Sequence, residues 1–251
     1  MLTYFNNYIK TRLPAITCKE CILGPIYRNI GNTFLVDIIM LLNFHMAYVQ
    51  YAITALVSLN RMTVMIKYTV IEPIWKKYMW IPVFLIFTVP LLNSRVVFNY
   101  VTVVTYSDST EAYSVTSPMP INDIFSLCIP FMIGATILSV VFNVISITMV
   151  RHVNMNKKNR AEFNFIIMTS ITCAVQVCGT ALSVSRLMLV GTDVAVTLAG
   201  FIPFISDGLS LVQPWLLFGF SHIIRGKINE SFGIKKRRGA ISISVVRSFT
   251  N

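Results

Sequence analysis

The residues most able to do chemistry in this chain are polar side chains set in or beside long apolar runs. Asn60 and Arg61 end one such run. An arginine offers five donors in a fixed fork, able to pair with helix-end carbonyls or with the C-terminus of an incoming partner. The pair can therefore act as a switch, or the arginine can extend to the lipid headgroups. Spacing alone favours the headgroup role.

Asp207 lies near the middle of another apolar run. An ionisable group at that depth is expensive to bury, so we expect it to face a bundle interior or a watery cavity. It could serve as a polar switch or an ion site, or it could make a structural hydrogen bond worth about 0.6 kcal/mol. Further along, Pro214 lacks a backbone donor and is expected to kink the helix near its inner end, which provides a hinge.

Two more polar residues at this depth, His45 and Gln176, are candidates for lining a ligand cavity. A hydrogen-bonded packing role suits His45 equally well. Four side chains are candidate partners of Asp207, namely Asn143, Gln176, Asn43 and His45.

The sequence shows no nucleophile–base pair, no phosphate loop and no cluster of metal ligands, so we predict neither an enzyme nor a bound cofactor or metal. Cys18 and Cys21 form a lone CxxC, which is weak evidence for zinc or redox chemistry. These two thiols could pair with each other or remain free.

Composition points to a membrane. Among 251 residues, 55% are hydrophobic and only 12% are charged, against about 25% charged in soluble proteins. The net charge of +11 does not indicate nucleic-acid binding, because the basic residues sit beside apolar runs and not along one soluble face.

Five runs are long and apolar enough to cross a bilayer core of about 30 Å. They are residues 33–60, 78–94, 124–150, 163–186 and 194–220. Membrane strands would be shorter and would alternate strictly. We therefore predict an all-α polytopic membrane bundle of five transmembrane helices.

Lys and Arg residues set the predicted orientation, because cytoplasmic loops carry an excess of them. They concentrate in the loops after the first and third runs and in the tail. Residues 1–32 are then extracellular, residues 33–220 form the transmembrane domain and residues 221–251 form a cytoplasmic tail. The basic residues within 1–32 fit this poorly. The tail should hold a short amphipathic helix and a basic cluster suited to anionic lipid, formed by Lys235, Lys236, Arg237 and Arg238.

Several short motifs resemble nematode serpentine chemoreceptors of class gamma, within the seven-transmembrane G-protein-coupled receptor superfamily. Residues 51–61 (YAITALVSLNR) resemble the third helix of that class, and residues 206–210 (SDGLS) leading into 213–217 (QPWLL) resemble the seventh. Residues 8–14 (YIKTRLP) resemble its first outer loop. The resemblance implies that the five helices match helices three to seven, with the first two absent. It gives Asn60 and Arg61 the role of a G-protein-facing switch and gives Asp207 and Pro214 that of a seventh-helix switch.

The predicted function is thus a chemosensory G-protein-coupled receptor, or a truncated product of one, in the plasma membrane of sensory neurons with its C-terminus cytoplasmic. Its partners would be the bilayer, a heterotrimeric G protein and an unidentified small-molecule ligand, with receptor oligomers possible. One alternative is a non-signalling membrane partner of full-length receptors. The other is a transporter or channel subunit that uses Asp207.

Overall fold

The computed structural model describes residues 2–9, 13–15, 17, 19–30, 33–66, 68–108, 111–152 and 157–220. The chain divides into two compact units, residues 1–214 and 215–251. The first unit holds the helix bundle, and the second begins within the last turns of the final helix. The amphipathic helix and basic cluster expected in the tail, Lys235 to Arg238, lie outside the described residues.

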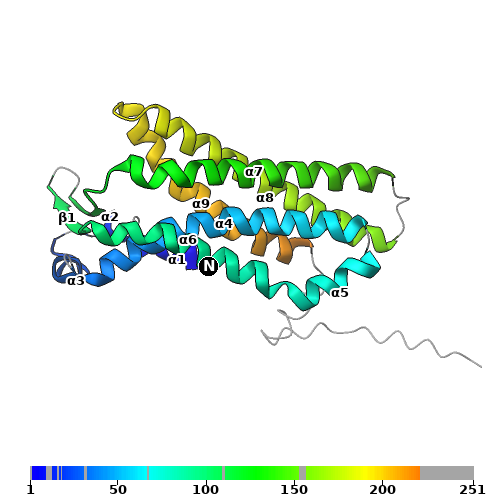
Figure 1. Ribbon diagram of the computed structural model, residues 1–251. Helices are drawn as coiled ribbons and strands as arrows, with labels where there is room; N and C mark the ends of the chain where they lie inside the picture. Colours follow the sequence, from blue (N-terminus) through cyan, green and yellow to red (C-terminus); the bar gives the residue numbers. More distant parts are fainter. Residues whose placement is uncertain are drawn as a thin grey trace, which may run out of the picture. The chain divides into compact units, whose positions relative to one another are not determined.

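The first unit is built from long helices, and the segments Leu13–Ala15, Gly24–Ile30 and Val103–Ser107 lie at one end of them (Figure 1). In chain order the elements are α1 (Leu2–Asn7), α2 (Leu13–Ala15), α3 (Gly24–Ile30), α4 (Phe34–Ile66), α5 (Tyr68–Tyr78), α6 (Trp80–Ser94), the 3-10 helix η2 (Arg95–Asn99), β1 (Val103–Ser107), β2 (Ala112–Thr116), α7 (Ile121–His152), α8 (Lys157–Met188) and α9 (Asp193–Phe220).

Five helices in the described part of the chain are long and apolar enough to cross a membrane. Their candidate spans are Phe34–Ile66, Trp80–Asn99, Phe125–Val150, Asn164–Met188 and Asp193–Leu216. Each overlaps one of the apolar runs of the sequence, which confirms the all-α membrane bundle. Helices are the expected form, because a spanning segment must satisfy its backbone hydrogen bonds internally.

Helix α4 is the centre of the bundle and packs against α6, α7 and α8. The core between these helices contains the aromatic side chains of Tyr48 and Tyr51 from α4 and the buried Met132 from α7. Leu209 of α9 joins the same cluster. Polar side chains also bridge helices, since Asn143 Nδ2 of α7 donates to Ser58 Oγ of α4 at 2.9 Å.

The stretch between the first two spans is helical, although we expected a loop there. Helix α4 continues to Ile66, and α5 follows almost directly. A Glu72–Lys76 ion pair of 2.8 Å lies along α5. Trp75 Nε1 of α5 donates to Thr63 Oγ1 of α4 at 2.9 Å, which ties the helix back to the end of α4.

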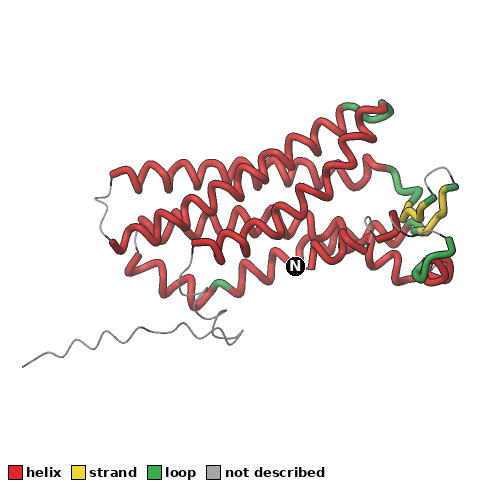
Figure 2. Tube along the Cα trace, turned by 180° about the vertical axis from the view of Figure 1, so that it is seen from behind, coloured by secondary structure: helices red, strands yellow, loops and turns green. Residues whose placement is uncertain are grey.

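The predicted loop between the second and third spans contains a hairpin, which the sequence patterns did not reveal. Strands β1 and β2 pair antiparallel, with Val103 opposite Thr116 and Ser107 opposite Ala112. Figure 2 shows these strands at one end of the helices. The backbone N–H of Thr102 donates to Asp37 Oδ1 at 3.1 Å and so fastens the hairpin to the start of α4.

The N-terminal segment packs onto the hairpin. Tyr27 of α3 stacks on Tyr113 of β2, with ring centroids 5.7 Å apart. Lys19 Nζ donates to Asp108 Oδ1 at 2.7 Å, and this hydrogen bond raises the pKa of the lysine above its ordinary value. Cys21 is disulfide-bonded, whereas Cys18 lies outside the described residues. The CxxC cysteine that is described is therefore not a free thiol.

Candidate functional site

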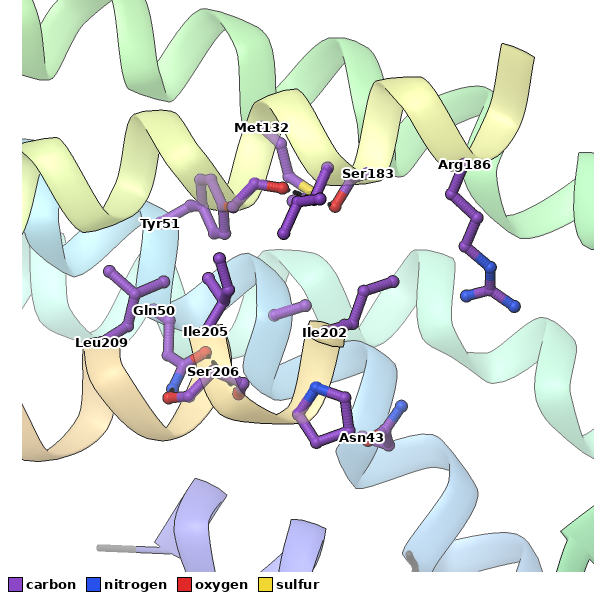
Figure 3. Close-up of a pocket in the computed structure, with 14 residues that line it drawn as sticks. Asn43, Gln50, Tyr51, Met132, Ser183, Arg186, Ile202, Ile205, Ser206 and Leu209 are labelled. Atoms are coloured by element: carbon purple, nitrogen blue, oxygen red, sulfur yellow. Dashed lines mark hydrogen bonds between the residues drawn. The ribbon is translucent and has the colours of Figure 1, made fainter. Parts of the chain in front are cut away.

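A cavity of about 260 Å³ opens between α4, α7, α8 and α9 (Figure 3). Its walls combine apolar side chains with a few amides, hydroxyls and one guanidinium. The residues that line it are Asn43, Ala47, Gln50, Tyr51, Met132, Gly179, Leu182, Ser183, Arg186, Ile202, Pro203, Ile205, Ser206 and Leu209. A mostly apolar hollow with a few convergent polar groups is the usual form of a small-molecule site.

Hydrogen bonds join two walls of the cavity. Gln50 Nε2 of α4 donates to Ser206 O at 3.1 Å and to Ser210 Oγ at 2.6 Å, both on α9. Ser206 Oγ returns a hydrogen bond to Gln50 Oε1 at 3.2 Å. Both ends of the Gln50 amide are thus committed to α9, and this side of the cavity is held by a polar clasp between the two helices.

Gly179 of α8 sets the inner end of the cavity. A methyl group at this position would lie 2.5 Å from the hydroxyl oxygen of Tyr51 and 2.8 Å from Cγ2 of Ile205. Real Cβ atoms do not approach so closely, so only glycine allows the Tyr51 ring to reach α8 here. Because Gly179 has no side chain, Tyr51 of α4 and Ile205 of α9 can both approach α8 beneath the cavity.

Arg186 and Asn43 stand at the other end, and Figure 3 shows both away from Leu209 and Tyr51. The Arg186 guanidinium lies 5.7 Å from the ring centroid of Phe125, a cation–π contact on the α7 side. No Asp or Glu of the described residues forms an ion pair with it. The cavity therefore has a cationic group at its mouth and uncharged side chains, including Leu209, Ile205 and the hydrogen-bonded Gln50, at its inner end.

Asn60 and Arg61, the predicted G-protein-facing switch residues, are not part of the cavity lining. The Arg61 guanidinium of α4 sits 4.2 Å from the ring centroid of Phe165, near the start of α8. The neighbouring Asn60 has a buried side-chain oxygen without a hydrogen-bond partner among the described residues. Helix α8 thus carries the contact with Arg61 near one end and Arg186 near the other.

The sequence matches a family of known proteins. The sequence model described as "Srg family chemoreceptor" matches residues 1–228. The chain belongs to the Srg family. It is 25% identical over 244 residues to "Serpentine receptor class gamma-31" of Caenorhabditis elegans, covering 92% of this chain and 78% of that protein. No solved structure matches the chain.

Family membership confirms the resemblance to class gamma serpentine receptors and makes this Srg chain a chemosensory receptor of the G-protein-coupled type, embedded in a membrane through apolar helices. A receptor family implies a non-enzyme. Within the described part of the chain, no three His, Cys, Asp or Glu side chains are grouped so that they could hold a metal ion.

The other predicted site residues of this Srg chain fall outside the cavity lining. His45 is buried, with its ring 6.3 Å from that of Phe87. Gln176 is completely buried, and neither amide atom has a hydrogen-bond partner among the described residues. Asp207 is buried at 7% exposure, and its candidate partner Asn143 donates elsewhere, to Ser58 and Ser139. The ligand-lining role of His45 and Gln176 stays a prediction.

The sequence analysis did not identify Gln50, Phe165 or Arg186 as site residues. A signal was present for two of these, because polar residues recur at helical spacing within apolar runs. Asn43 and Gln50 are two turns apart on α4, and Ser183 and Arg186 lie on one face of α8. Nothing local marks Phe165, because it matters only through its contact with Arg61.

Proposed function

We propose that this chain detects a small molecule in the cavity between α4, α7, α8 and α9 and passes the signal to a heterotrimeric G protein at the Arg61 end of α4. One observation carries the proposal. Helix α8 lines the cavity with Gly179, Ser183 and Arg186, and its opposite end carries Phe165 against Arg61. At about 1.5 Å per residue, Phe165 is about 20 Å from Gly179 and about 30 Å from Arg186 along one rigid element.

The mechanism follows from this shared helix. A ligand held between α8, α9 and α4 displaces α8 relative to α4 when it binds the displaced arrangement more tightly than the resting one. The displacement separates Phe165 from Arg61, which frees the guanidinium to pair with carbonyls or with the C-terminus of a partner. Asp207 and Pro214 lie on α9, where a change in the Gln50 clasp would reach them; we assign them the accompanying rearrangement of that helix.

Charge supports the orientation that this mechanism needs. The basic loops and tail predict that Arg61, the start of α8 and the C-terminus face the cytoplasm. The hairpin, Arg186 and the mouth of the cavity then face outward. We propose the plasma membrane of a sensory cell as the site of action and the basic tail residues Lys235–Arg238 as an inner-leaflet contact.

The test uses the full chain in cells that carry a reporter of G-protein dissociation, with surface levels measured alongside. Responses to a library of small organic compounds are compared between the native chain, Ala47→Leu and Ala52→Leu. Both substitutions enlarge an alanine of α4, but only Ala47 lines the cavity. We expect Ala47→Leu alone to lose responses.

Two results would count against the proposal. Equal loss or equal retention in the two variants would place the ligand elsewhere. A chain that reaches the surface without driving the reporter, yet changes the surface level of a coexpressed full-length relative, would favour the non-signalling partner.

A further inference from the structure

The mouth of the cavity carries an arginine whose charge the protein leaves without a carboxylate. Arg186 is half-buried, lines the cavity and touches the face of Phe125. Among the described residues, the ion pairs are made by other side chains, Lys19 with Asp108 and Lys76 with Glu72. Arg186 lies two residues before the end of the span Asn164–Met188, where a half-buried guanidinium without a carboxylate partner in the described part of the chain is available to an anionic ligand.

The second donor at this mouth is Asn43. No hydrogen bond to its side chain exists within the described part of the chain, in contrast to Gln50, whose amide is committed to α9. An amide and a guanidinium at one end of a cavity together offer several N–H donors. The guanidinium suits a planar anion, because its fork matches the two oxygens of a carboxylate, and Asn43 adds N–H donors at the same end of the cavity.

The rest of the cavity limits the size and polarity of the remaining part of a ligand that carries such an anion. Away from these two donors, the lining includes Met132, Ile205 and Leu209, and the amide of Gln50 is already hydrogen-bonded to α9, so this part of the cavity accepts hydrocarbon and not charge. A volume of about 260 Å³ corresponds to roughly nine waters at about 30 Å³ each, and so to a ligand of about ten non-hydrogen atoms. The occupant must therefore be small, apolar along its length and anionic at one end.

We propose that the cavity binds a short-chain organic carboxylate, with its carboxylate on Arg186 and Asn43 and its hydrocarbon toward Leu209. The inference rests on the proposed function, since it gives the chemical class of the ligand for the same cavity. It also assigns Arg186 as the residue that selects for charge, and Met132, Ile205 and Leu209 as those that limit chain length.

Thermal stabilisation of the purified full chain in lipid nanodiscs tests this assignment, because a ligand that binds only the folded state raises the unfolding temperature. The probes are straight-chain carboxylates from butanoate to decanoate, each beside its primary alcohol and its primary amine. We expect the carboxylates to stabilise the chain at lower concentrations than their alcohols, with the amines weakest.

The variants are Arg186→Gln, Arg186→Lys and the control Arg95→Gln. Arg95 is an exposed arginine at the end of α6 that does not line the cavity. Losing the charge-assisted pair should weaken the apparent affinity for the carboxylate by roughly 10- to 100-fold in Arg186→Gln, while leaving the alcohol unchanged. Arg186→Lys should retain part of the preference, and Arg95→Gln all of it. Non-specific effects of the probes on the bilayer act equally on every variant.

Equal stabilisation by carboxylate and alcohol, a preference for the amine, or an undiminished carboxylate response in Arg186→Gln would overturn the assignment. So would a lack of stabilisation by every series. The proposed function is tested separately, by the reporter responses of Ala47→Leu and Ala52→Leu. If neutral compounds activate the receptor through this cavity, the proposed function stands and only the assignment of a carboxylate ligand is refuted.

Discussion

Replacing Phe165 with leucine is expected to raise signalling in the absence of any ligand. The Arg61 guanidinium lies 4.2 Å from the centroid of the Phe165 ring, inside the distance of about 6 Å at which a cation is attracted to an aromatic face. Leucine keeps an apolar side chain of similar reach but has no π face. The substitution therefore removes the attraction that holds the ends of α4 and α8 together.

The size of the effect follows from the partial burial of this contact. Cation–π attraction contributes about 0.5–1 kcal/mol at exposed sites and about 2 kcal/mol when desolvated, so we take about 1–2 kcal/mol here. At 1.4 kcal/mol per factor of ten, the ratio of active to resting receptor rises by about 5- to 30-fold. A receptor that is about 1% active at rest would become about 5–20% active.

The assay is the unstimulated reporter of G-protein dissociation at matched surface expression. Phe165→Tyr is the control, because tyrosine keeps the ring face and should stay close to the native level. The reasoning is refuted if leucine leaves the basal signal unchanged. It is refuted equally if leucine and tyrosine raise the signal to the same extent, since the ring would then not be what holds Arg61.

Substitutions at four further positions test the packing in the helix bundle and at the outer hairpin. Gln50→Leu should lower the unfolding temperature, because it removes interhelical hydrogen bonds worth about 0.6 kcal/mol each. Gln176→Leu should leave the unfolding temperature unchanged or raise it, because it removes a buried amide that has no hydrogen-bond partner among the described residues. Equal destabilisation by the two substitutions would contradict this reasoning. Gly179→Ala should cost about 1–3 kcal/mol by overpacking, and an unchanged unfolding temperature would show that the neighbouring side chains yield freely. Asp37→Ala should speed hydrogen exchange at the Thr102 amide while Asp37→Asn preserves the acceptor; equal exchange rates in both variants would remove the role given to this carboxylate.

The five spans could be read from the sequence because the bilayer leaves so few choices. A long charge-poor run must satisfy its backbone hydrogen bonds within itself, and residues 124–150 and 194–220 are helical for that reason. Outside the bilayer the constraint is relaxed, so the hairpin of β1 and β2 was missed. Its strands are short, and Asp37, which accepts a hydrogen bond from Thr102 beside β1, lies 65 residues earlier in the sequence.

The candidate site was only partly predictable, since its residues meet across the chain. Arg61 stood out by its position after an apolar run, but its aromatic partner lies on a later helix. Gln50 and Ser206 are 156 residues apart in the sequence, and no local pattern relates them. Asp207 and Gln176 were predicted as site residues because they are isolated polar groups in apolar runs. The polar residues that line the cavity, such as Asn43 and Gln50, instead recur along one face of a helix.

The length of α4 has a consequence for where its ends operate. Its 33 residues extend about 50 Å, whereas the hydrocarbon core of a bilayer is about 30 Å thick. About 20 Å of the helix must therefore project into the headgroups and the water beyond, or be accommodated by tilt. Asp37 lies near one end of α4 and Arg61 near the other, so the thickness of the membrane determines whether each residue is surrounded by lipid or by water. A thicker bilayer would draw Arg61 and its aromatic partner toward the lipid and strengthen their attraction, so the resting activity of the receptor should fall as the membrane thickens.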